Sequence, residues 1–173
     1  MSDFLLGCNY WDSASGTDMW KNWDESVIKA DLAALKKIGV KHLRVFPNWR
    51  DFQPVDKYLT YQGAQREYFV PKGAECEAPD YVDKKMIRRF KRFAEIANSY
   101  EMELTVSLLT GWMSGRLFFP PALQNKGLLT DDEALTLTNR YVTKLVNEFK
   151  SIPNIVMWDL GNECNCIERV SSR

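Results

Sequence analysis

The sequence predicts an α/β fold in which parallel strands alternate with helices. Four short apolar runs recur along the chain, and an amphipathic stretch with helical spacing follows each of the first three. Helix-capping and helix-stopping residues stand between these segments. Alternation of this kind places consecutive strands side by side with right-handed crossovers. We therefore expect a parallel sheet covered by helices.

The first unit has a strand over residues 4–8 that continues into 9–11. A long aromatic loop then leads to Asp24, whose side chain is suited to capping a helix start. The helix is expected to run to Ile38, because apolar residues recur every three or four positions, and Gly39 is its stop.

The second unit has its strand over 40–46, and Pro47 ends it because proline cannot donate to a central ladder. Residues 48–80 form a long loop, with a short hairpin around 58–70 as an option. Loops of this length are usually functional in compact domains, so we expect a wall of a substrate cleft here. The helix over 83–100 has a basic outer face. A solvated surface explains that face better than a nucleic-acid site, since no aromatic platform is interleaved with it.

The third strand covers 103–109, and its helix begins at the capping box Thr130–Glu133. A turn over 151–154 leads into the fourth strand, which stops at Gly161. A doubly wound sheet would normally have a glycine-rich turn after its first strand, and this chain lacks one. A closed eight-stranded barrel typically needs about 250 residues. We therefore predict one domain over 1–173 that forms the N-terminal half, the first four strands, of a TIM barrel.

Composition narrows the possible partners. The 23 basic residues balance the 23 acidic ones, so net charge favours neither nucleic acid nor a membrane surface. No apolar run approaches the length of about 18 residues that spans a bilayer. The first residues lack a basic leader with a long apolar core, so we expect a cytoplasmic protein, or a secreted one if a leader was removed.

Cysteine and histidine usage argues against a metal or cofactor. The four cysteines are not needed as disulfide staples in a chain with this much apolar sequence. Cys164 and Cys166 have the wrong spacing for a zinc pair, and His42 is the single histidine. Because His42 lies in a predicted strand, Ser-His-Asp catalysis is not expected either.

The strand ends carry the residues expected to function, since barrels of this type place their sites at the carboxyl ends of the strands. These ends are rich in tryptophan and amide side chains, which suit the apolar faces and hydroxyl rims of sugars. The candidates are Trp11, Trp49 and Trp112, with Asn162 and Glu163 at the tip of the last strand. The alternative is that some of the tryptophans merely fill the barrel mouth.

The segment 154–165, with Gly161-Asn162-Glu163 at a strand tip, resembles the fourth strand of clan-A glycoside hydrolases. The chain looks most like family 5 mannanase or glucanase relatives, with family 2 close behind. Many family 5 members have a histidine at the end of the third strand, where this chain has Ser107–Gly111. Further matches lie at Gly7–Trp11, Met19–Trp20, Asp31–Leu32, Gly39–Val40, Leu43–Phe46, and Trp49 with Asp51–Pro54.

The resemblance implies hydrolysis of O-glycosidic bonds in β-linked oligosaccharides or polysaccharides of the mannan or glucan type, by retaining double displacement. It implies that Glu163 is the acid/base, that Asn162 binds the sugar 2-hydroxyl, and that Arg44 contacts the nucleophile. That nucleophile is a glutamate on the seventh strand, which this sequence does not reach. We therefore expect the isolated chain to be inactive or nearly so.

A second carboxylate cannot be selected from the sequence. Asp159 lies on the same strand as Glu163, roughly 13 Å away along it, which is too far for either glycosidase geometry. Several loop carboxylates could approach, but no motif selects one of them: Asp12, Asp18, Asp51 and Glu67.

Four parallel strands leave open edges, so we expect a homo-oligomer or binding of the missing C-terminal half-barrel. The alternatives for function are a non-catalytic carbohydrate-binding protein and a half-barrel assembly protein without activity.

Overall fold

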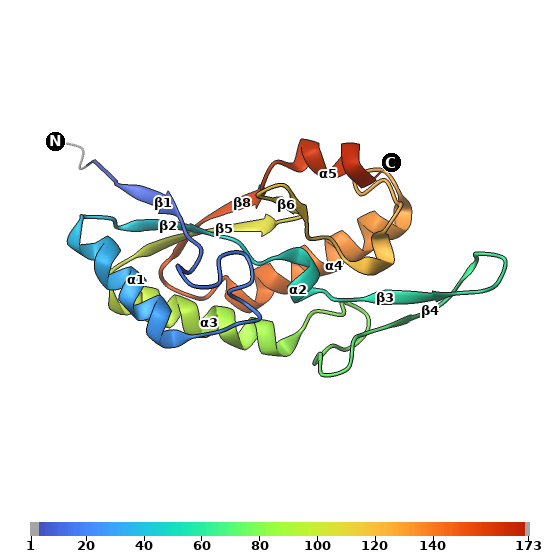
Figure 1. Cartoon of the computed structure of the whole chain (residues 1–173), viewed down its shortest axis with the longest axis horizontal. Helices are drawn as coiled ribbons and strands as arrows, with labels where there is room; N and C mark the ends of the chain where they lie inside the picture. The colour runs from blue at the N-terminus through green and yellow to red at the C-terminus, as the bar shows by residue number, and fades with distance from the viewer. Residues whose placement is uncertain (1–3, 172–173) are drawn as a thin grey trace.

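The computed structural model describes residues 4–171 and contains a four-stranded parallel sheet in the order β1–β2–β5–β8 (Figure 1). The strands are β1 (Gly7–Asn9), β2 (His42–Val45), β5 (Glu103–Leu109) and β8 (Ile155–Gly161). Their spatial order follows their order along the chain. This confirms the predicted parallel α/β sheet, and the predicted strand positions agree to within a few residues.

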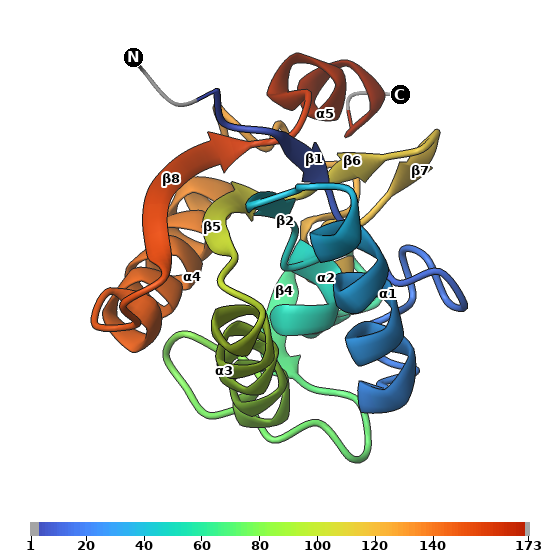
Figure 2. The same ribbon diagram turned by 90° about the vertical axis from the view of Figure 1, so that its left-hand side faces the viewer.

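The three long helices lie on one side of the sheet (Figure 2). They are α1 (Glu25–Lys37), α3 (Lys84–Ser99) and α4 (Asp132–Phe149). Leu43 and Val45 of β2, with Leu104 and Val106 of β5, are buried in the core. The facing helices contribute apolar residues to the same core, among them Ile28, Leu32, Phe90, Phe93, Leu145 and Phe149.

Aspartates cap all three of these helices, as elementary capping chemistry requires. The Asp24 carboxylate accepts hydrogen bonds from the backbone N–H groups of Ser26 and Val27, and Asp83 accepts one from Lys85. The start of α4 differs from the prediction. Its N-cap is Asp131, which accepts from the N–H groups of Glu133 and Ala134, one residue after the expected Thr130.

The long segment 48–80 contains the hairpin, β3 (Asp56–Leu59) and β4 (Gln65–Phe69), which projects from the body of the molecule (Figure 1). The structure confirms the hairpin that the sequence offers as an option around 58–70. The sequence does not predict α2 (Trp49–Phe52), because a four-residue helix is too short to show a period. Four further short elements follow: β6 (Trp112–Met113), β7 (Arg116–Leu117), the 3₁₀ helix η1 (Pro121–Leu123) and α5 (Cys164–Ser171).

The basic outer face of α3 is paired with acidic side chains, which explains how so many cations share one helix. Nη2 of Arg88 donates to both carboxylate oxygens of Glu75, at 2.9 and 2.8 Å, and Lys91 contacts Glu148 at 2.6 Å. Arg92 contacts Glu25 at 2.9 Å. The face is therefore a network of ion pairs rather than an open cationic patch.

Both outer edges of the sheet carry exposed apolar side chains. On β8, Met157 is 56% exposed and Leu160 is 68% exposed, and Phe4, before β1, is 90% exposed. An edge strand also offers unpaired N–H and C=O groups to a further strand. Among the helices that the structure describes, none is long and apolar enough to cross a membrane.

Candidate active site at the carboxyl ends of the strands

Parallel strands bring their carboxyl ends to one edge of the sheet, and the polar residues of interest gather there. The strand arrows in Figure 1 point to the side where β6 and α5 lie. On the face of the sheet away from the long helices, all four strands line a hollow of about 620 Å³. Its lining includes His42, Arg44, Thr105 and Asp159. This polar face contrasts with the branched apolar layers that usually fill barrel interiors.

The end of β8 has room only for glycine. A Cβ atom on Gly161 would lie 2.5 Å from the carbonyl oxygen of Leu109 and 2.7 Å from Sγ of Cys164. The next residue, Asn162, donates its backbone N–H to that same Leu109 oxygen at 3.2 Å. The close packing of this strand tip against β5 thus fixes the position of the Asn162 backbone.

Glu163 connects β8 to α5 in an uncommon backbone conformation. Its φ is +47°, in the left-handed region that few non-glycine residues adopt, and such positions concentrate at functional sites. Its carbonyl oxygen accepts the N–H of Cys166 at 2.8 Å, so the helix starts directly after it. The Glu163 side chain is exposed. An exposed carboxyl group at the strand tip is open to a ligand entering from this edge.

The Asn162 side chain is held at both ends. Its Oδ1 accepts a hydrogen bond from Nη1 of Arg44 at 3.1 Å, and its Nδ2 donates to the backbone oxygen of Trp112 at 3.0 Å. These two contacts assign the amide orientation, because only the oxygen can accept from a guanidinium. The amide is therefore presented in one orientation beside Glu163.

Arg44 links three of the four strands. Its Nε donates to Oδ2 of Asp159 at 2.8 Å, its Nη2 donates to the same oxygen, and Nη2 also reaches Oγ of Ser107 at 3.2 Å. Spacing along β8 excludes Asp159 as a nucleophile but does not predict this pairing with Arg44. The signal was available, since Asp159 is the single charged residue in the apolar run of β8.

Two of the three candidate tryptophans lie at this edge. Trp11 is half-buried and stacks on Phe46, with ring centroids 5.1 Å apart and planes at 13°. The Arg44 guanidinium lies 4.7 Å from the centroid of the Phe46 ring, in cation–π range. Trp112 is half-buried in β6, and its backbone contacts Asn162.

The expectation for Trp49 needs correction, because this side chain belongs to the core. It is 2% exposed, stacks on Tyr141 at 6.0 Å, and donates its indole N–H to Oε1 of Gln53 at 2.8 Å. The unpredicted helix α2 turns it inward. A sugar cannot stack on a ring that has no exposed face.

The loop carboxylates that could not be ranked from sequence have structural partners of their own. Asp12 caps a turn by accepting the N–H of Ala14 at 3.1 Å, and buried Asp51 contacts Nζ of Lys21 at 2.9 Å. Asp18 lies 4.0 Å from Arg116, and Glu67 lies on the projecting hairpin. None of these contacts places a second carboxyl group beside Glu163.

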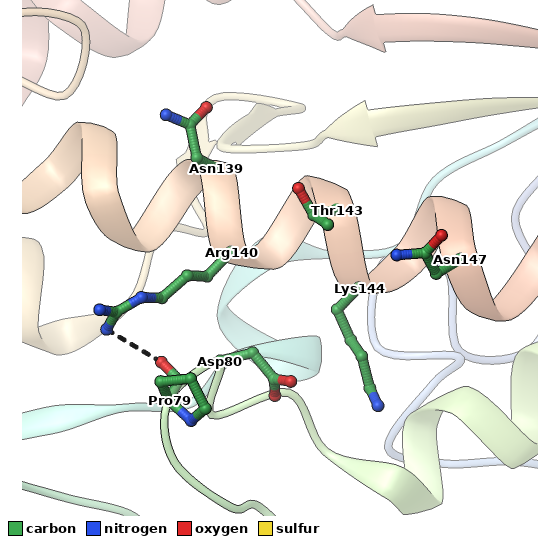
Figure 3. Close-up of a pocket in the computed structure, with 7 residues that line it drawn as sticks. All are labelled: Pro79, Asp80, Asn139, Arg140, Thr143, Lys144 and Asn147. Atoms are coloured by element: carbon green, nitrogen blue, oxygen red, sulfur yellow. Dashed lines mark hydrogen bonds between the residues drawn. The ribbon is translucent and has the colours of Figure 1, made fainter.

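A second cavity, of about 370 Å³, lies on the outer side of α4 (Figure 3). Pro79 and Asp80 form one wall, and Arg140 donates to the Pro79 oxygen at 3.1 Å across it. The opposite wall is polar and comes from α4: Asn139, Arg140, Thr143, Lys144 and Asn147. The lining lacks an aromatic ring, so this groove offers no stacking surface for a sugar.

Comparisons with known proteins bear on the fold of the chain. No protein-family profile matches the chain. A β-galactosidase of Heyndrickxia coagulans is 26% identical over 149 residues, which is 84% of this chain and 20% of that protein.

Among solved structures, an exo-β-1,4-mannosidase from Opitutaceae bacterium strain TAV5 superposes with a TM-score of 0.78 at 25% identity, over 99% of this chain and 27% of its own. A GH5_18 protein from Bifidobacterium longum subsp. infantis gives 0.76 at 25% identity, over 96% of this chain and 35% of its own. The chain thus spans about a third or less of each of these proteins. The match confirms the predicted fold, the first four strand–helix units of a TIM barrel.

Proposed function

From the premise that this chain resembles the family 5 glycoside hydrolases of clan A and has the fold of their N-terminal half-barrel, we propose that it supplies the acid/base half of a retaining β-glycosidase site. The carrying observation is the tip of β8, where Asn162 accepts a hydrogen bond from Arg44 and exposed Glu163 follows directly, at the carboxyl ends of the strands. The similarity to glycoside hydrolases supports a glycan as the substrate.

Glu163 is the proton donor in this proposal. A retaining mechanism needs one carboxylic acid that protonates the leaving oxygen and later takes a proton from the attacking water. The exposed position of Glu163 at the strand tip leaves it free for this role. The carboxylates Asp159 and Asp51 are committed to Arg44 and Lys21.

The sugar lies between polar and aromatic groups in this proposal. The remaining hydrogen-bonding capacity of the Asn162 amide faces the hydroxyl rim, and the exposed parts of Trp11 and Trp112 stack on the C–H faces. The neighbour from Opitutaceae is named as an exo-β-1,4-mannosidase, so β-1,4-linked mannose is the first sugar to try.

The nucleophile comes from polypeptide outside these 173 residues, because retaining chemistry needs a second carboxyl group about 5 Å from the first. The same polypeptide would cover the open edge of β8, where Met157 and Leu160 are exposed. A further set of strand–helix units, or a second copy of this chain, could fill this position. A stable monomer in sedimentation of the purified chain would argue against the second copy.

Calorimetry with β-1,4-linked manno-oligosaccharides tests the proposed function. We expect the purified chain to bind them without hydrolysis, and Asn162→Ala to weaken binding about tenfold, the loss typical of a directional polar contact. Asn139→Ala, in the groove on α4, is the matched control and should leave affinity unchanged. Absence of binding would contradict a sugar site. Turnover by the chain alone, abolished by Glu163→Gln, would support Glu163 as the acid. It would contradict a nucleophile that comes from outside the chain.

A further inference from the structure

We propose that Asp159 is a positioning residue of this site, whose carboxylate sets the Arg44 guanidinium and, through it, the Asn162 amide. This inference rests on the proposed function, because Asn162 is the group that would bind the sugar. It assigns a role to a residue that spacing along β8 excludes as nucleophile.

The pairing spans the sheet. Arg44 on β2 lies opposite Thr105 of β5, and Asp159 on β8 lies opposite Ser107 of β5, so one strand separates the two partners. Adjacent strands lie about 4.8 Å apart, so a side chain must cross roughly 10 Å. Arginine has that reach, and its planar fork can bind a carboxylate through two N–H groups. Both Nε and Nη2 are directed to the same Asp159 oxygen.

The contact leaves a defined donor for Asn162. A guanidinium has five N–H groups. Asp159 and Ser107 engage Nε and Nη2, so Nη1 points to Oδ1 of Asn162 at 3.1 Å. Rotation of the guanidinium away from Asp159 would move Nη1 away from Asn162 as well. The orientation of the amide therefore depends on a residue that does not touch it.

Asp159 acts on the strand tip by a second route. Its other oxygen, Oδ1, accepts the backbone N–H of Gly161 at 3.2 Å, two residues further along β8. This local hydrogen bond bends the chain end in the manner of an Asx turn. One carboxylate thus holds Asn162 through its side-chain partner and through the backbone that precedes it.

The two routes can be separated by substitution. An asparagine at 159 keeps an oxygen that can accept from Gly161, but its NH₂ group cannot accept from the guanidinium. The side chains of Arg44 and Asp159 are 28% and 30% exposed. A partly exposed pair contributes little to overall stability, so Asp159→Asn should fold and show its effect at Asn162.

The test uses the ¹⁵N spectrum of the purified chain, with Asp159→Asn and Asp159→Ala compared against Glu75→Gln. Glu75→Gln is the matched control, because it removes the charge of an exposed carboxylate that pairs with Arg88 on α3. We expect Asp159→Asn to shift or broaden the side-chain signals of Arg44 Nε–H and Asn162 Nδ2. Affinity for β-1,4-mannobiose should fall about tenfold, whereas Glu75→Gln should change neither.

Unchanged Asn162 signals in a folded Asp159→Asn variant would overturn the proposal. Movement in Asp159→Ala alone would also overturn it, because the Gly161 contact would then be sufficient. If the native chain binds no mannobiose, the proposed function fails, while the Arg44 and Asn162 signals still decide the role of Asp159.

Discussion

At the scale of single residues, the proposed chemistry rests on Glu163 and its neighbours. Gly161 is required by close approach to β5, Asn162 is fixed by Arg44 and Trp112, and Glu163 turns the chain into α5. A different physical constraint therefore acts at each residue of the tripeptide. Substitutions should separate a role in structure from a role in chemistry.

Glu163→Gln should impair proton donation selectively, when tested in the assembly that restores turnover. We expect kcat to fall about 10²- to 10⁴-fold for a mannobioside, whose leaving alcohol needs a proton. The decrease in the rate of the glycosylation step should be much smaller for a dinitrophenyl mannoside, because its leaving group departs without a proton. Equal losses of that step on both substrates would contradict the acid role.

Gly161→Ala should destabilise the strand tip. The added methyl group would meet Leu109 backbone and Cys164 at under 3 Å, which forces β8 away from β5. We expect a loss of about 1–3 kcal/mol in the free energy of unfolding, as for other overpacked sites. Urea denaturation measures it. Gly63→Ala on the hairpin turn has open space around it and serves as a control for backbone strain without a clash.

The tryptophans should respond oppositely to truncation. Trp49→Ala removes a core side chain and is expected to cost about 3–5 kcal/mol of stability. Trp112→Ala should lower mannobiose affinity and change stability less, because its ring is only half-buried. Thermal unfolding and calorimetry on both variants check this. A stable Trp49→Ala variant with lost sugar binding would restore the original expectation for Trp49.

At the scale of elements, the projecting hairpin is tied to the body by Glu133 at the start of α4. Tyr68 of β4 donates to Glu133 at 2.7 Å, and Nζ of Lys57 on β3 lies 3.1 Å from it. Burial opposes ionisation of Glu133, but the hydrogen bonds from Tyr68, Lys126 and Lys57 prevail and lower its pKa. The hairpin is therefore held by a charged anchor.

Glu133→Gln should loosen this hairpin. Tyr61 at its tip is 96% exposed, and we expect chymotrypsin to cut after it several-fold faster once the anchor is gone. Glu95→Gln, at an exposed carboxylate on α3, is the control. Because the Glu133 pKa is lowered in the fold, the anchor is complete above about pH 4.5 and is lost as the pH falls further. Equal cleavage rates in both variants would exclude the anchor.

Local chemistry made much of the fold predictable. Asp24, Asp83 and Gly39 mark helix ends through capping and backbone geometry that depend on near neighbours alone. The burial of Trp49 and the pairing of Asp159 could not be predicted, because they depend on partners over ninety residues away, Tyr141 and Arg44. Periodicity and spacing along one strand cannot report such partners.

At the scale of the whole molecule, half-buried thiol and phenol groups should make the protein sensitive to alkali. Burial, with the nearby carboxylate Asp83, raises the pKa of Cys76 to about 12, and burial, with a hydrogen bond to Glu133, raises that of Tyr68 to about 12. The unfolded chain loses such protons from about pH 9 upward. The folded state thus binds more protons between pH 9 and 12, so stability is complete below pH 9 and declines above it.

Urea denaturation at pH 7 and at pH 10.5 checks this dependence. We expect a lower midpoint at the higher pH and a smaller decrease in Cys76→Ser, which lacks the half-buried thiol. Identical midpoints at the two pH values would show that these groups ionise freely in the folded protein.

The half-barrel fold also explains why one face of the sheet is apolar and the other is polar. Its helix side packs into the apolar core over β2 and β5, while its other side carries the Arg44–Asp159 pair and the polar hollow. Met157 and Leu160 are exposed on β8, at the outer edge of the sheet that we propose is covered by further polypeptide. Function is therefore expected at the carboxyl edge of the sheet and not at the groove on α4.

Titration of the ¹⁵N-labelled chain with β-1,4-mannobiose tests that placement most directly. We predict that signals of Arg44, Asn162, Glu163 and the indoles of Trp11 and Trp112 move together, while those of Asn139 and Asn147 in the α4 groove stay fixed (Figure 3). Movement confined to the groove, or no movement at millimolar sugar, would contradict the account.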